Sequence, residues 1–157
     1  MARNLVIESH NGHEIWSTGL ATFAEFENGS RKIIVGVRCR IHSGEAEEIA
    51  LLDTGSTYTV IGSELVEEFE SQLIEEGQVK IRTYMGEIKG ALVRLDITLL
   101  AEEGDDLRVT EALALVSQDW NGPVVLGYRG FLERIRIALD PGVGPPSQQL
   151  FYFGSCE

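Results

Sequence analysis

One segment of the sequence has residue types that suit acid–base chemistry, Asp53-Thr54-Gly55-Ser56. The apolar residues 50–52 precede it, which predicts a strand that ends in an ionisable side chain at a sharp chain reversal. Gly55 allows close approach of the backbone and can donate its N–H to the carboxylate, while the Thr54 and Ser56 hydroxyls can fix the orientation of that side chain. The pattern indicates a carboxylate held at a tight turn, although an ordinary Asx or Ser/Thr turn has the same composition.

The histidines and cysteines give no sign of a metal site. His10, His13 and His42, together with the two cysteines Cys39 and Cys156, show no ligand spacing. Two cysteines cannot form a disulfide framework, and the one at position 39 alternates with apolar neighbours as a buried thiol would. We therefore expect neither a metal ion nor a cofactor.

The length, composition and charge of the chain argue against a disordered, fibrous or nucleic-acid-binding protein. The chain has 157 residues, 43% of them hydrophobic and 24% charged, which favours one globular domain over a disordered or fibrous chain. Thirteen Lys and Arg against 25 Asp and Glu give a formal net charge of −12. This balance provides no basic surface for a phosphate backbone, so we expect no nucleic-acid partner.

Two further features bear on location. No segment approaches the roughly 18 consecutive apolar residues that a membrane-spanning helix needs. The N-terminal stretch has no apolar signal-peptide core, because Glu8, His10 and Asn11 interrupt it. We therefore expect a cytoplasmic protein without a membrane partner.

The elements that must position the Asp53 segment are mostly strands. Apolar and β-branched residues alternate with polar ones, and Gly, Asn, Asp or Pro separate the runs. The predicted strands cover residues 32–41, 48–52, 58–62, 79–83, 88–100, 108–116, 123–126, 137–139 and 150–153. Many short strands with little helix indicate an all-β barrel or sandwich.

One segment, 63–76, is predicted as a helix. Leu65, Phe69 and Leu73 recur at the spacing of one helix face, and the serine at the start of the segment can cap it. Gly77 follows where the helix should end.

The order and spacing of these elements make the sequence resemble the retropepsin-like aspartic proteases. The resemblance covers roughly residues 32–139 and consists of three parts. A hairpin leads into the Asp-Thr-Gly-Ser segment, a flap-like hairpin lies at 81–90, and the second family signature, VVLG at 124–127, is followed by a short helix.

The resemblance implies a fold and a division of the chain. The fold is all-β, a closed barrel of the type found in one pepsin lobe, with one main helix. Residues 1–30 would be an N-terminal extension, 31–140 the protease domain, and 141–157 a Pro/Gly loop with a C-terminal strand. The extension could be a removable segment, an interface strand or a cover for a sheet edge.

The resemblance also implies an activity, hydrolysis of peptide bonds by an aspartic endopeptidase. This chemistry needs two carboxylates that share one proton. The chain has one Asp-Thr-Gly-Ser segment, so the second carboxylate must come from a second chain, in a homodimer with Asp53 and its symmetry mate at the two-fold axis. Thr54 resembles the threonine that reaches across the dimer, Gly55 supports the loop, and Ser56 matches a hydroxyl that binds the catalytic carboxylate.

The substrate, a peptide or protein, would lie under a flap formed by Tyr84, Met85 and Gly86. One departure concerns the contact between subunits. In viral members an arginine directly follows the glycine of the second signature, whereas here Tyr128 intervenes before Arg129.

Two other functions compete with proteolysis. A retropepsin-like dimer could hold an extended peptide through main-chain hydrogen bonds without cleaving it, or it could serve only to dimerise. The intact Asp-Thr-Gly-Ser segment favours the enzyme, because a non-catalytic domain gains nothing from bringing two carboxylates together.

Two expectations follow for the proposed enzyme. The aromatic tail 150–153 should contribute to the dimer interface, because exposed aromatics at a terminus are otherwise a liability. The pH optimum should be acidic, between about 3 and 6, because the dyad is active in the pH range in which it holds one proton. A hydrogen bond from Ser56 to the dyad should move this range to lower pH.

Overall fold

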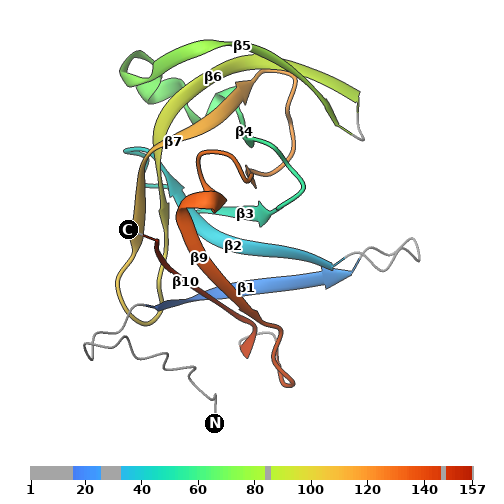
Figure 1. Ribbon diagram of the computed structural model, residues 1–157, viewed down its shortest axis with the longest axis vertical. Coiled ribbons are helices and arrows are strands. Elements are labelled where there is room, and N and C mark those ends of the chain that lie inside the picture. The colour runs from blue at the N-terminus through green and yellow to red at the C-terminus, as the bar shows by residue number, and fades with distance from the viewer. Residues whose placement is uncertain (1–15, 26–32, 84–85, 146–147, 157) are drawn as a thin grey trace.

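The computed structural model describes residues 16–25, 33–83, 86–145 and 148–156, which form ten strands and three short 3₁₀ segments (Figure 1). The strands are β1 (Ser17–Glu25), β2 (Ile33–Ile41), β3 (Glu48–Leu52), β4 (Thr59–Gly62), β5 (Ile74–Thr83), β6 (Gly86–Leu99), β7 (Leu107–Ser117), β8 (Val125–Leu126), β9 (Ile135–Asp140) and β10 (Leu150–Ser155). The 3₁₀ segments are η1 (Ser63–Leu65), η2 (Glu67–Gln72) and η3 (Leu132–Arg134). The prediction of an all-β fold is confirmed.

All ten strands belong to one sheet, in the order β5-β6-β7-β4-β8-β3-β2-β1-β10-β9. The sheet curls, because β6 pairs with β7 along most of its length and also with β2 at three positions from Cys39↔Leu99 to Ile41↔Ile97. The closed barrel that the resemblance implies stays a prediction.

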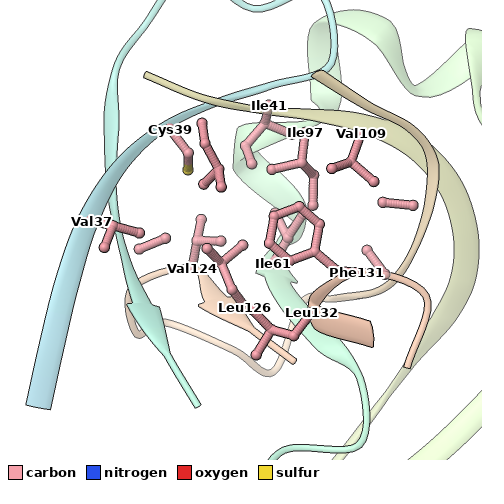
Figure 2. Packing of buried hydrophobic residues seen from close by; sticks show 14 of the residues in the cluster. Val37, Cys39, Ile41, Ile61, Ile97, Val109, Val124, Leu126, Phe131 and Leu132 are labelled. Atoms are coloured by element: carbon pink, nitrogen blue, oxygen red, sulfur yellow. The ribbon is translucent and has the colours of Figure 1, made fainter. Parts of the chain in front are cut away.

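The alternation that predicted the strands also builds the core. In β2 the side chains of Val35, Val37, Cys39 and Ile41 are buried, while the residues between them are glycine or only partly buried. Figure 2 shows side chains of β2, β4, β6, β7 and β8 converging around Phe131, which is fully buried. Strands that are far apart in the sequence therefore share one core beneath the loop that follows β3.

The prediction of one main helix at 63–76 is wrong. Its first part forms the short segments η1 and η2, and the backbone leaves helical geometry at Phe69, whose side chain is buried in the core. Its last part belongs to β5, where Ile74 pairs with Arg94 of β6. Gly77 adopts a φ of +151° at an irregularity in that pairing rather than ending a helix. The long β5–β6 hairpin therefore overrides the local helical pattern.

The C-terminal strand corrects another expectation. Phe151, Tyr152 and Phe153 are buried in the chain's own fold, and β10 pairs with β1 on one side and β9 on the other. The aromatic side chains are therefore covered within the chain itself, and a contribution of the tail to a dimer interface stays a prediction. Its neighbour β1, which the sequence placed within the N-terminal extension, pairs with β2 from Ala21↔Val37 to Glu25↔Ile33.

None of the helical segments in the described part of the chain has the length and apolar character that a membrane-spanning helix requires.

Candidate active site

Asp53 lies in the exposed loop that directly follows β3. The backbone N–H of Gly55 donates to Asp53 Oδ1 at 2.9 Å, as the sequence predicted. The N–H of Ser56 donates to the carbonyl oxygen of Asp53 at 3.1 Å and closes the turn. One carboxylate oxygen is therefore oriented by the loop itself, while the side chain remains open to solvent.

The strand before Asp53 is held by β8, which runs parallel to β3. The N–H of Leu51 donates to the carbonyl of Val124 at 2.8 Å, and the N–H of Asp53 donates to the carbonyl of Leu126 at 3.1 Å. Leu126 is fully buried in the core, so the backbone of the aspartate rests on a rigid support.

The far side of the loop is fixed by the residues after β8. The N–H of Tyr128 donates to the carbonyl of Ser56, and the N–H of Arg129 donates to the carbonyl of Thr57, both at 2.9 Å. The loop is thus tied on both sides to one short segment that is far from it in the sequence.

Gly127 connects these two sets of bonds, and no other residue fits there. Its N–H donates to Oγ1 of Thr59 at 3.1 Å, and Thr59 is completely buried. A Cβ at position 127 would lie 2.2 Å from the carbonyl carbon and oxygen of Tyr58. The glycine of the second signature therefore makes a close backbone contact with Tyr58, and this contact positions the loop of Asp53.

Comparison with known proteins now gives the family. A family model described as "Aspartyl protease" matches residues 37–129, which include both the Asp53 loop and Gly127. The chain belongs to the aspartyl protease family. This match confirms the resemblance to the retropepsin-like aspartic proteases.

Among solved structures, the chain is similar to the protease of simian foamy virus (mac), which was determined in solution. The two are 18% identical, and the match covers 59% of this chain and 86% of the viral one, with a TM-score of 0.38. None of the curated proteins matches the chain.

In this member of the aspartyl protease family, the expected contact between the hydroxyl of Ser56 and the carboxylate of Asp53 is not present. Ser56 Oγ donates instead to the carbonyl oxygen of Tyr58 at 2.7 Å, within the same loop. Because the hydroxyl has one proton, that hydrogen bond leaves none for the carboxylate. Ser56 therefore supports the shape of the loop.

The flap expected at Tyr84, Met85 and Gly86 is described only in part. Tyr84 and Met85 lie outside the described residues, and Gly86 begins β6 with a φ of +121°, which favours glycine. The hydroxyl of Thr83 donates to the carbonyl of Gly86 at 2.8 Å. The β5–β6 hairpin and the β3–β4 loop extend to the same side of the molecule (Figure 1).

Sequence reasoning missed Thr59, the buried hydroxyl that holds Gly127. The available signal was a polar residue at the start of the apolar strand 59–61, where a side-chain oxygen needs a buried donor. Thr54 is exposed beside Asp53, and its expected role across a dimer stays a prediction.

The groups whose pKa the structure shifts lie on other strands. Burial alone would raise the pKa of Asp96, but hydrogen bonds from the Glu111 N–H at 2.9 Å and the Arg108 Nε at 3.0 Å, together with the Arg108 charge, lower it. Burial raises the pKa of the Cys39 thiol to about 12, with a smaller effect from the charge of Glu48. Among the described residues, no group of three or more His, Cys, Asp or Glu could hold a metal ion.

Proposed function

We propose that the protein is an aspartic endopeptidase in which Asp53 and the same residue of a second chain form a catalytic dyad. The observation that carries this proposal is the exposed carboxylate of Asp53, oriented by the Gly55 N–H in a loop that is anchored on both sides. The chain has a single Asp-Thr-Gly-Ser segment, so the pair requires a homodimer.

The two carboxylates take different roles because they share one proton. The ionised carboxylate accepts a proton from a water molecule, whose oxygen attacks the carbonyl carbon of the peptide. The protonated carboxyl donates its proton to the carbonyl oxygen, which gives a tetrahedral diol. When the diol collapses, the C–N bond breaks, the nitrogen takes the proton that the first carboxyl received from water, a diol hydroxyl gives its proton to the other carboxylate, and the dyad again holds one proton.

The other residues of the loop contribute to this chemistry by holding the carboxylate of Asp53 and the loop in place. The Gly55 N–H holds Oδ1 of Asp53, which leaves Oδ2 without a partner among the described residues and open to water or to the partner's carboxyl. Thr54 is exposed next to the aspartate and can bind the opposite loop across the two-fold axis. Ser56 maintains the turn through the carbonyl of Tyr58.

The substrate is an extended peptide that lies between this loop and the β5–β6 hairpin. Tyr84, Met85 and Gly86 form the flap that covers it, with Gly86 at a backbone angle that shapes the hairpin tip. The long hairpin can bind the backbone of an extended substrate through main-chain hydrogen bonds, as one strand binds another. Such binding depends little on the side chains of the substrate.

The test is hydrolysis of a peptide library across pH by the full chain, compared with Asp53→Asn. The asparagine can still accept the Gly55 N–H, so the loop keeps its shape while the acid is lost. Asp105→Asn is the matched control, an exposed acid in the turn between β6 and β7. We expect Asp53→Asn to abolish cleavage and the control to retain it. Peptide binding without cleavage by the wild type would contradict the proposal and indicate a binding module.

A further inference from the structure

The N-terminal part of strand β6 lies beyond the end of β7. The pairing between β6 and β7 stops at Ala91↔Val116, while β6 includes residues 86–90 as well. Among the described residues, these five pair with β5 and with no other strand, so the hairpin extends past β7 as a two-stranded ribbon (Figure 1). Two strands alone are marginally stable in water, and the position of this ribbon therefore depends on what holds its base.

Two polar side chains take the place of the β7 backbone at Lys89. The backbone N–H of Lys89 donates to Oδ2 of Asp119 at 3.1 Å. The hydroxyl of Ser117 donates to the carbonyl oxygen of Lys89, and the same hydroxyl oxygen accepts the N–H of Asp119 at 3.1 Å. Both backbone groups of one hairpin residue are therefore bound by the last residue of β7 and by the loop that follows it.

The residues on either side of Lys89 are packed closely. A Cβ on Gly90 would lie 2.1 Å from the carbonyl oxygen of Val116, so the two backbones are in direct contact there. On the other side, the buried side chain of Ile88 packs in a small apolar cluster. The other buried members of this cluster are Val60, Leu115, Trp120 and Val125. The base of the hairpin is thus held by side-chain hydrogen bonds between two packed positions.

The segment that binds Lys89 also leads to the support of the Asp53 loop. It continues through Trp120, whose Nε1 donates to the carbonyl of Pro123 at 2.8 Å, into β8. At the end of β8, the carbonyl of Leu126 accepts the N–H of Asp53. One short segment, residues 117–126, therefore binds both the base of the hairpin and the catalytic loop, and it sets the position of one relative to the other.

We propose that Ser117 and Asp119 are positioning residues, which anchor the β5–β6 hairpin at Lys89 and hold it in place relative to the loop of Asp53. The inference rests on the proposed function, because this hairpin is the flap of the proposed enzyme. The two side chains act through the backbone of the hairpin and not on the reacting atoms. They should therefore affect how tightly the substrate is held, and leave the chemistry at the dyad unchanged.

The first test measures hydrogen exchange of the Lys89 amide by NMR in the full chain, without substrate. Asp119→Ala removes the acceptor of this amide, whereas Asp119→Asn keeps an oxygen that can accept it. We expect exchange to become about tenfold faster in Asp119→Ala, because one hydrogen bond is lost, and to stay within about threefold of the wild type in Asp119→Asn. The Leu115 amide in the middle of β7 should keep its exchange rate, which shows that the change is local. Asp105→Ala, which removes an exposed acid from the β6–β7 turn, is the matched control and should leave Lys89 unchanged.

The second test separates substrate binding from chemistry. A hairpin that moves more freely binds substrate and transition state less tightly by the same amount, so Asp119→Ala should raise KM about fivefold and leave kcat within about twofold. Ser117→Ala, which removes the donor to the Lys89 carbonyl, should give the same split. Asp119→Asn should restore KM. Partial unfolding alone would instead lower kcat per chain at constant KM.

The two tests fail separately. An unchanged exchange rate of Lys89 in Asp119→Ala would overturn the inference, and so would a fall in kcat at constant KM in that variant. Peptide hydrolysis that still depends on Asp53 would then leave the proposed function standing. If the wild-type chain cleaves no peptide, the proposed function fails, and the exchange rates still decide whether Asp119 anchors the hairpin.

Discussion

Substitution of Gly127 by alanine tests how the catalytic loop is supported. The new Cβ would lie 2.2 Å from the carbonyl carbon and oxygen of Tyr58 and 2.6 Å from the backbone nitrogen of Thr59. These are backbone atoms at the start of β4, so no side chain can rotate away to make room. The segment after β8 must move, which also breaks the buried hydrogen bond from Gly127 to Thr59 Oγ1.

The expected magnitude combines two effects. Overpacking in a well-packed interior costs about 1–3 kcal/mol, and the loss of a buried hydrogen bond costs about 1–2 kcal/mol more. We therefore expect Gly127→Ala to lower the free energy of unfolding by about 2–5 kcal/mol, a large share of the roughly 5–15 kcal/mol of a typical domain. Equilibrium urea unfolding measures this value, and kcat should fall with it because the loop of Asp53 loses its support.

Gly36→Ala is the matched control. Its Cβ would meet Cγ2 of Ile49 at 3.0 Å, and that side chain is 61% exposed and free to turn. We expect a change below about 1 kcal/mol at this position. If Gly127→Ala unfolds at the same urea concentration as the control and keeps full activity, the close contact with Tyr58 does not hold the loop.

Three further predictions concern single side chains. Ser56→Ala should leave the alkaline limb of the pH profile of kcat/KM unchanged, because the hydroxyl binds a carbonyl of the loop, and a shifted limb would show that it reaches the dyad. Asp96 has a folded pKa below its unfolded value, so it stabilises the fold above about pH 4 and loses this contribution as the pH falls through the folded pKa. Urea unfolding of Asp96→Asn should accordingly converge with the wild type at low pH, and a constant difference would contradict the ion pair with Arg108. Cys39, with a pKa of about 12 and a buried thiol, should resist alkylation at pH 8 in the native protein while the exposed Cys156 reacts, so mass spectrometry should find one modified thiol per native chain and two after unfolding.

Most of the strands and the Asp53 turn were predictable because their signals are local, whereas β1 and the first part of β5 were not predicted as strands. Alternation of apolar residues in β2 marks one buried face, and the spacing of Asp53 and Gly55 contains the hydrogen bond that orients the carboxylate. Both features depend on residues within a few positions of each other.

The predictions that failed depend on contacts between distant segments. The helical pattern around Phe69 gives way because residues 74–83 pair with β6, which local periodicity does not reveal. The aromatics of the tail were expected to need a partner chain to cover them, but β10 inserts between β1 and β9, which are more than a hundred residues apart in the sequence. From the sequence, the hydroxyl of Ser56 could donate either to the carboxylate of Asp53 or to a nearby backbone carbonyl. The folded loop places it on the carbonyl of Tyr58.

The central claim is that catalysis needs one Asp53 from each of two chains. Wild-type chain and Asp53→Asn are mixed in equal amounts, unfolded and refolded together, and assayed for peptide hydrolysis at a fixed total concentration well above the dimer dissociation constant. Random pairing makes only about one quarter of the dimers fully wild type, so activity should fall to about one quarter of that of the pure wild type. A fall to about one half would mean that each chain catalyses on its own, and it would contradict the shared dyad.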